Sequence, residues 1–169
     1  MRGRWRISCG VSTTAFLYRA LSVDVYRIHD RRFHALSGFG AGVRGGRWNP
    51  RGVPVVYTSP AYEGTLLEVL AHMEASRIPR GHVASRIVLP GDCEVRVLDS
   101  DDCPDWSDRA ACRDIGREWI ESRRSLALQV PAYVAQPWGR NVLLNPHHPH
   151  FGRVRVGKVA DVGWDPRLF

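Results

Sequence analysis

Segments typical of β-strands alternate with helical segments along most of this chain, and this alternation restricts the fold more than any other feature. Runs rich in β-branched and aromatic residues predict strands over 23–28, 53–58, 82–90, 94–99, 126–134, 141–146 and within 153–165. Helical spacing of apolar residues predicts a helix from 59 or 60 to about 74 and another over 108–122. The helices fall between strands. We therefore predict a single α+β domain with a central β-sheet and flanking helices.

The chain is 169 residues long, which is about one domain. Residues 1–22 begin with basic residues, but Ser, Thr and Arg19 interrupt the apolar core that a signal peptide needs. No stretch reaches the ~18 apolar residues of a membrane span. We interpret 1–22 as an N-terminal extension, either poorly packed or the product of a start codon assigned too far upstream, and 23–169 as the domain. We expect a cytoplasmic protein without membrane contact.

The net charge is +7, and nearly all of the positive charge is arginine, since Lys158 is the only lysine. Such a balance is compatible with nucleic acid, an acidic protein or a phosphorylated small molecule as partner. The arginines are scattered rather than gathered in a run, which argues against a DNA-binding arm. We therefore expect no direct contact with nucleic acid.

A glycine-rich segment precedes two residues suited to binding a nucleotide. Residues 29–46 predict a long loop, with five glycines between Gly38 and Gly46. Arg47 follows, and an arginine presented from such a loop can grip a diphosphate. Tyr57 ends a predicted strand just before a helix, where its ring could stack on an aromatic ligand. An ordinary surface arginine and a core tyrosine are the alternatives.

Glu68 lies between leucine and valine in the first predicted helix, close to its apolar face. The residues predicted to pack inward from this helix are Leu66, Leu67, Leu70 and Met73. A nearly buried carboxylate needs a cation, hydrogen bonds or a reaction that uses it. The alternative is a glutamate on the helix flank paired with an arginine. Ser59 followed by Pro60 predicts the N-cap and first turn of this helix.

Three histidines, His147, His148 and His150, occur in the segment "NPHHPHF". A proline-broken loop does not readily aim three imidazoles at one point, and no carboxylate motif accompanies them, so we expect no metal site. The chain also lacks the glycine fingerprint of dinucleotide-binding domains and the phosphate-binding loop of nucleotide hydrolases.

In their order along the chain, these segments resemble the RES domain, a family named for shared arginine, glutamate and serine residues. The resemblance begins with "GGRWNPRGVPVVYTSPAYEGTLLEVLAHME" at 45–74. It continues through "DW", "IGREWI", "SLALQVPAYV", "NVLLNPHHPHF" and the terminal "DPRLF", and so covers roughly 25–169. RES proteins are toxins of bacterial type II toxin–antitoxin systems. Their fold resembles that of ADP-ribosyltransferases of the diphtheria-toxin type.

The resemblance implies NAD+ as substrate, no prosthetic group and no metal. Family members hydrolyse or phosphorolyse NAD+, or use it to ADP-ribosylate a protein, so the acceptor stays open between water, phosphate and protein. The implied partner is a cognate Xre-like antitoxin whose C-terminal part plugs the site. A toxin homodimer within that complex is a further expectation. A non-catalytic basic binding module remains the alternative outside enzymes.

The resemblance also assigns roles to residues. Arg47 would hold the diphosphate or its ribose side, and Tyr57 would stack on nicotinamide. Glu68 would stabilise the charge that develops on the ribose as nicotinamide leaves, or orient the attacking group. The expected NAD+-binding residues are Arg47, Tyr57, Asn49, Ser59 and Asn145.

One position departs from the family pattern. Many members read V-P-S where this chain has Val130, Pro131 and Ala132, so the family serine is replaced by alanine. Loss of an ordinary hydrogen bond would cost about 0.5–1.5 kcal/mol. Ser59 or Ser125 would have to compensate for it, and a weakened toxin is the alternative.

Overall fold

The computed structural model describes residues 23–73, 80–99, 102–103 and 105–169; the expected extension over 1–22 lies outside the described residues. The strands are β1 (Val23–Asp30), β2 (Val56–Thr58), β3 (His82–Leu89), β4 (Val95–Val97), β5 (Ala127–Pro131), β6 (Arg140–Leu144) and β7 (Arg155–Asp161). The helices are α1 (Phe39–Arg44), α2 (Tyr62–Ala71) and α3 (Arg109–Ser122), with 3-10 turns η2 (Tyr133–Ala135), η3 (Phe151–Arg153) and η4 (Pro166–Leu168).

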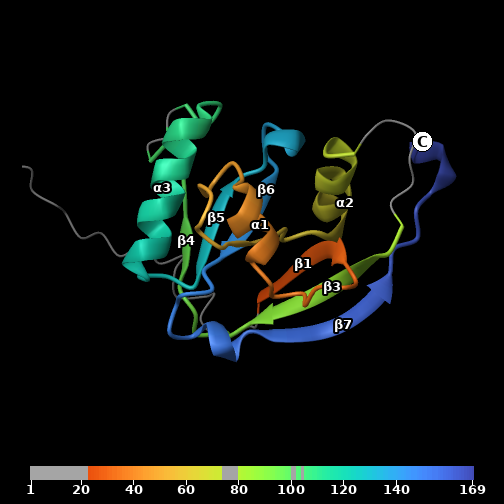
Figure 1. The fold of residues 1–169 in the computed structure, drawn as a ribbon, viewed down its shortest axis with the longest axis horizontal. Coiled ribbons are helices and arrows are strands. Elements are labelled where there is room, and N and C mark those ends of the chain that lie inside the picture. Colours follow the sequence, from red (N-terminus) through yellow and green to blue (C-terminus); the bar gives the residue numbers. More distant parts are fainter. Residues whose placement is uncertain (1–22, 74–79, 100–101, 104) are drawn as a thin grey trace, which may run out of the picture.

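The strands form two sheets. One has the order β1-β3-β7 and is antiparallel throughout, and the other has the order β2-β6-β5-β4, in which only the β4–β5 pair is parallel. Backbone hydrogen bonds of 2.8 and 2.9 Å between Tyr26 and Ser59 join the edge of β1 to the chain just after β2. Figure 1 shows α3 beside β4 and β5, whereas β7 curves along the opposite rim.

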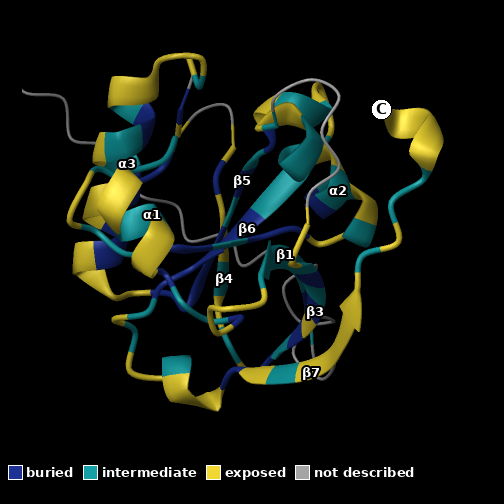
Figure 2. Cartoon of the chain, turned by 45° about the vertical axis from the view of Figure 1, so that its right-hand side comes forward, coloured by how far each residue is buried: buried dark blue, intermediate teal, exposed yellow. Residues whose placement is uncertain are grey.

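The four-stranded sheet is covered on both faces. Along β6, Val142 and Leu144 join the core shared with the three-stranded sheet, whereas Leu143 joins the core shared with α3. This division follows from the two-residue period of a strand. Figure 2 shows the buried residues concentrated around β5 and β6, while β7 is largely exposed. The mixed α+β class is therefore confirmed, with two sheets in place of one.

Helix α3 matches the predicted span closely. Asp108 caps its first turn, because its Oδ1 accepts hydrogen bonds from the backbone N–H groups of Ala110 (2.7 Å) and Ala111 (3.3 Å). It ends at Arg123, whose φ of 50° leaves the helical region. No helix among the described residues combines the length and apolarity that crossing a membrane requires.

The predicted start of α2 was wrong. The helix begins at Tyr62, its N-cap is Ala61, and no side chain caps it. Ser59 is instead tied by its backbone to Tyr26. The inward-facing prediction also fails for Leu67, which is 40 % exposed. The one buried residue of α2 is Thr65.

Four other segments differ from prediction. The glycine-rich loop contains the short helix α1. The sequence did not predict this helix, because it has no periodic apolar face and no buried residue. The strand expected over 53–58 is limited to Val56–Thr58, since pairing with β6 covers only these residues. Past Pro131 the chain turns into η2 instead of continuing as a strand. The last segment forms the single strand β7.

Candidate active site

Glu68 on α2 and Asn141 near the start of β6 are in direct contact. Asn141 Nδ2 donates a hydrogen bond to Glu68 Oε1 at 2.6 Å, and the Glu68 side chain is 29 % exposed. His72, one turn further along α2, donates from Nδ1 to the Glu68 carbonyl at 2.7 Å and lies 3.9 Å from Oε2. The carboxylate is therefore oriented through one oxygen and remains partly open to solvent. An asparagine partner orients Glu68 in place of the arginine considered from the sequence.

Tyr57 is fixed by its hydroxyl group. The hydroxyl donates to Asn49 Oδ1 at 2.8 Å and accepts from the Trp48 N–H at 3.0 Å. Burial raises the pKa of Tyr57 to about 12, and the charge of Glu68 adds to the increase. The Trp48 hydrogen bond and the charges of Arg113 and Arg109 act in the opposite direction. Tyr57 is thus neutral at ordinary pH, and its ring is held in one orientation.

Arg47 reaches away from Tyr57 toward the segments that follow β4 and β5. Its Nη1 donates to the Trp106 carbonyl at 3.0 Å, and its guanidinium carbon lies 4.0 Å from the centre of the Tyr133 ring. The Trp106 and Tyr133 rings are themselves in edge-to-face contact, with centroids 6.0 Å apart. Stacking on Tyr133 and hydrogen bonds to the Trp106 carbonyl and the Cys112 thiol therefore position the guanidinium, while other N–H groups are left for a ligand.

Helix α3 holds the loop that carries Arg47. Arg113 Nε donates to the Gly46 carbonyl at 3.1 Å. Gly116 packs so closely on the Trp48 backbone that a β-carbon there would overlap the Trp48 carbonyl oxygen. Gly46 likewise leaves no room for a β-carbon, because the Tyr57 hydroxyl occupies that position. The loop is therefore clamped between α3 and Tyr57.

Three residues expected to bind substrate are buried and engaged within the protein. Asn49 is 0 % exposed; its amide donates to the carbonyls of Ala41, Pro50 and Val53, and its oxygen accepts from Tyr57. These contacts use every polar group of the side chain except one lone pair. We assign Asn49 to holding the loop rather than to contacting a ligand.

Asn145 and Ser59 are also placed structurally. Asn145 follows the end of β6 opposite to Asn141, about 13 Å away along a strand. Its Nδ2 donates to the Ile120 carbonyl at 3.0 Å, and its Oδ1 accepts from the His147 N–H at 2.9 Å. Ser59 is 2 % exposed, with its hydroxyl packed against Gly64.

Sequence reasoning missed the residues that orient the predicted ones. Asn141 holds Glu68, whereas Trp106 and Tyr133 hold Arg47. A polar asparagine at the start of an otherwise apolar strand was the available signal for Asn141. Trp106 lies in the segment "DW", which carried the family resemblance but came without a role for the tryptophan.

Ala132 lies just beyond β5, buried, with its N–H donating to the Gly139 carbonyl at 2.9 Å. Ser125 lies before the other end of β5, where its hydroxyl accepts from Trp119 Nε1 at 2.9 Å and donates to the Ala127 carbonyl at 3.1 Å. Ser125 therefore cannot supply the hydroxyl that the family pattern places at 132.

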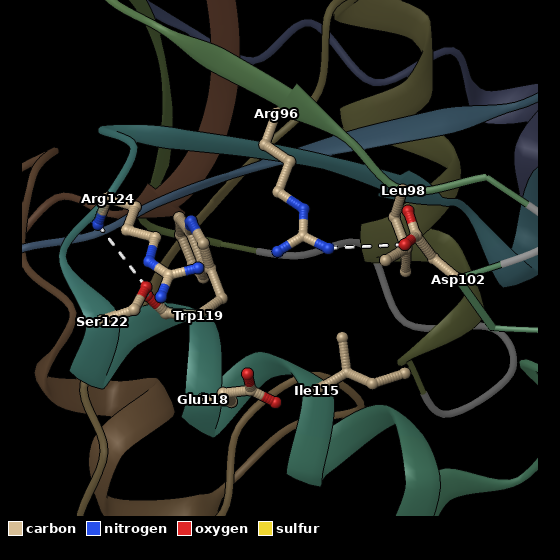
Figure 3. A pocket seen from close by; sticks show the side chains of 8 residues that line it. All are labelled: Arg96, Leu98, Asp102, Ile115, Glu118, Trp119, Ser122 and Arg124. Carbon is tan, nitrogen blue, oxygen red and sulfur yellow. Dashed lines mark hydrogen bonds and ion pairs between the residues drawn. The ribbon is translucent and has the colours of Figure 1, made fainter. Parts of the chain in front are cut away.

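Two cavities are lined by residues other than Glu68, Asn141 and Tyr57. The larger, about 270 Å³, adjoins Arg47 and is lined by Asp105, Trp106, Ser107, Tyr133 and Gln136. The other, about 150 Å³, lies between α3 and β4 and contains none of the predicted site residues. Figure 3 shows Arg96 and Asp102 pointing toward one another in this smaller cavity, 3.4 Å apart.

The three histidines of the C-terminal segment do not converge on a common point. His148 and His150 stack edge to face with ring centroids 5.3 Å apart. Within the described part of the chain, no three His, Cys, Asp or Glu side chains are grouped so that they could hold a metal ion.

The geometry is that of a small mixed α/β domain in which an asparagine holds a partly exposed carboxylate and a tyrosine hydroxyl holds the loop that carries an arginine. Residues 24–165 match the RES domain family. The chain belongs to this family.

Relatives and a solved structure agree with this assignment. A Prs ADP-ribosylating toxin from Sphingobium sp. (strain YBL2) is 31% identical over 162 residues, which are 92% of this chain and 97% of that protein. A Toxin Res from Yersinia enterocolitica is 38% identical over 152 residues, 85% of this chain and 98% of its own. A chain of the M. tuberculosis MbcT–MbcA toxin–antitoxin complex has the same fold, with a TM-score of 0.66 at 24% identity, covering 88% of this chain and 87% of that one.

Proposed function

We propose that this chain is the toxin of a type II toxin–antitoxin pair and that it cleaves the nicotinamide–ribose bond of cytoplasmic NAD+. The observation that carries the proposal is the Glu68 carboxylate, oriented by Asn141 at 2.6 Å and within electrostatic reach of Tyr57. The toxin names of relatives that match nearly their whole length support it.

The reaction suits this arrangement. When the bond from C1′ to the nicotinamide nitrogen breaks, its electron pair leaves with nicotinamide, and positive charge develops on the ribose. A fixed carboxylate lowers the energy of such an oxocarbenium-like state. Tyr57 would present its ring to nicotinamide, since its hydroxyl is committed to the loop. Arg47 would hold the diphosphate with the N–H groups that Trp106 does not use.

The test is release of nicotinamide from NAD+ by the purified chain, with and without inorganic phosphate. Glu68→Gln is the informative variant, because glutamine can still accept the Asn141 hydrogen bond but carries no charge. Glu63→Gln, an exposed position on the same helix, is the matched control. We expect release by the chain and the Glu63→Gln variant and little by Glu68→Gln. Equal release by all three would refute a catalytic role for Glu68.

A protein acceptor is the second candidate. A relative 31% identical to this chain is named as a Prs ADP-ribosylating toxin, and the partial exposure of Glu68 would admit a protein side chain. Transfer of labelled ADP-ribose to a protein, with no free ADP-ribose formed, would favour this activity over hydrolysis. Phosphate-dependent release would favour phosphorolysis.

The partner we propose is a cognate antitoxin of the Xre-like type, which binds the toxin and blocks its site. The structural neighbour comes from a toxin–antitoxin complex. Co-expression with the product of the adjacent gene, followed by purification and mass measurement, tests both the partner and the expected toxin homodimer. A chain that stays alone, binds no NAD+ and releases no nicotinamide would instead support the non-catalytic binding module.

A further inference from the structure

The cavity of about 270 Å³ next to Arg47 has the composition of a nucleoside site. Two of its lining residues are aromatic, Trp106 and Tyr133, and three are polar, Asp105, Ser107 and Gln136. Small-molecule sites typically combine apolar or aromatic walls with a few polar groups that fix orientation. Its volume falls just below the roughly 300–1,000 Å³ of complete ligand pockets. It therefore suits part of a dinucleotide rather than the whole.

Arg47 lies between Tyr57, which is near Glu68, and this cavity. The residue before it, Gly46, touches the Tyr57 hydroxyl, while its own side chain reaches Trp106 and Tyr133 in the cavity wall. The order of groups is thus carboxylate and tyrosine, then arginine, then an aromatic cavity. NAD+ has the matching order of nicotinamide riboside, diphosphate and adenosine.

We propose that this cavity binds the adenosine half of NAD+, with adenine against the aromatic walls and its ribose at Asp105. The proposal rests on the proposed function, because it extends the same substrate from Arg47 outward. It makes the site selective for the dinucleotide over nicotinamide mononucleotide, which lacks adenosine.

The polar groups are suited to these two parts of adenosine. Gln136 Nε2 donates to the Tyr133 carbonyl at 3.2 Å, which leaves its side-chain oxygen to accept from the adenine amino group. Tyr133 is 47% exposed, so a base can reach its ring although Arg47 stacks on it. Aromatic side chains commonly stack on bases in this way.

Asp105 provides selectivity at the ribose. Its Oδ1 accepts from the Ser107 N–H at 3.0 Å and from the Ser107 hydroxyl at 2.5 Å, and the residue is exposed. These bonds hold the pKa of the carboxyl below its usual range, so it is charged at neutral pH. A carboxylate accepts from a ribose 2′-hydroxyl and repels a 2′-phosphate. The cavity should therefore prefer NAD+ to NADP+.

The experiment measures binding to the full chain carrying Glu68→Gln, in which ligands are not consumed. The probes are NAD+, NADP+, nicotinamide mononucleotide and ADP, titrated by calorimetry. Asp105→Asn keeps an acceptor for Ser107 but removes the charge, and Gln136→Ala removes one exposed amide. Asp102→Asn, three residues away and facing the other cavity, is the matched control.

We expect Gln136→Ala to weaken NAD+ and ADP about tenfold, the value of one hydrogen bond, without changing nicotinamide mononucleotide. Asp105→Asn should reduce the preference for NAD+ over NADP+ about tenfold, and Asp102→Asn should change neither. If nicotinamide mononucleotide binds as tightly as NAD+, or if Gln136→Ala weakens both ligands equally, the adenosine site is overturned. If ADP binds and the variants weaken it as expected, but the wild-type chain releases no nicotinamide, the proposed reaction is contradicted while the adenosine site stands.

Discussion

The amide of Asn141 donates a 2.6 Å hydrogen bond to the carboxylate of Glu68 across 73 residues of sequence. It does so because β6 starts beside α2. A carboxylate that stabilises charge in a transition state is effective only when its position is fixed in advance. The pair therefore joins the fold to the proposed chemistry.

Asn141→Ala should lower the rate of nicotinamide release about 10- to 100-fold, because a displaced carboxylate loses much of its effect. The Michaelis constant for NAD+ should change little. The decisive measurement adds the double variant with Glu68→Gln. If Asn141 acts through Glu68, the double variant is no slower than Glu68→Gln alone. Additive losses would indicate that Asn141 only supports folding.

Arg47→Lys should raise the Michaelis constant for NAD+ about tenfold, since lysine keeps the charge but loses the planar fork and the stacking on Tyr133. Steady-state kinetics of nicotinamide release would show this. Arg51→Lys, an exposed arginine nearby, is the control and should behave as wild type. An unchanged Michaelis constant in Arg47→Lys would contradict a contact with the diphosphate.

Gly116→Ala should destabilise the protein by about 1–3 kcal/mol, because a methyl group at this position overlaps the backbone of Trp48. The displaced loop carries Arg47, so nicotinamide release should fall as well. Urea denaturation followed by fluorescence measures the free energy of unfolding. Gly152→Ala meets no neighbouring atom and should cost far less. Equal stability of the two variants would argue against the tight packing of α3 on the loop.

The raised pKa of Tyr57 predicts that the protein loses stability at high pH. Its folded pKa is raised from 10.0 to about 12, so the neutral form is favoured by folding. The resulting stability is complete below pH 10 and disappears as the pH rises from about 10 to about 12. Tyr57→Phe should remove this part of the pH dependence. It should also cost about 1–3 kcal/mol at pH 7, because Trp48 and Asn49 lose their partner.

These quantities are measured by denaturant unfolding at several pH values between 7 and 11.5. The difference in free energy of unfolding between the wild type and Tyr57→Phe should become smaller toward the alkaline end of this interval. A constant difference over that interval would mean that the Tyr57 hydroxyl titrates alike in the folded and unfolded states.

The sequence by itself determined the features that depend on near neighbours. The alternation of strand and helix, the span of α3, and the order of Arg47, Tyr57 and Glu68 were all readable, because periodicity and motif spacing are local properties of a chain. The start of α2 was misjudged for a long-range reason, since Ser59 pairs with β1 instead of capping the helix.

Only the tertiary structure decided how the predicted residues are oriented. Asn141 at Glu68, Trp106 at Arg47 and Arg113 at Gly46 are separated from their partners by 73, 59 and 67 residues. Such contacts depend on strand order and on the packing of α3, which no local pattern encodes. The same packing turned Asn49 and Asn145 into buried supports, because the cost of burying an amide is met only when its hydrogen bonds are satisfied inside the protein.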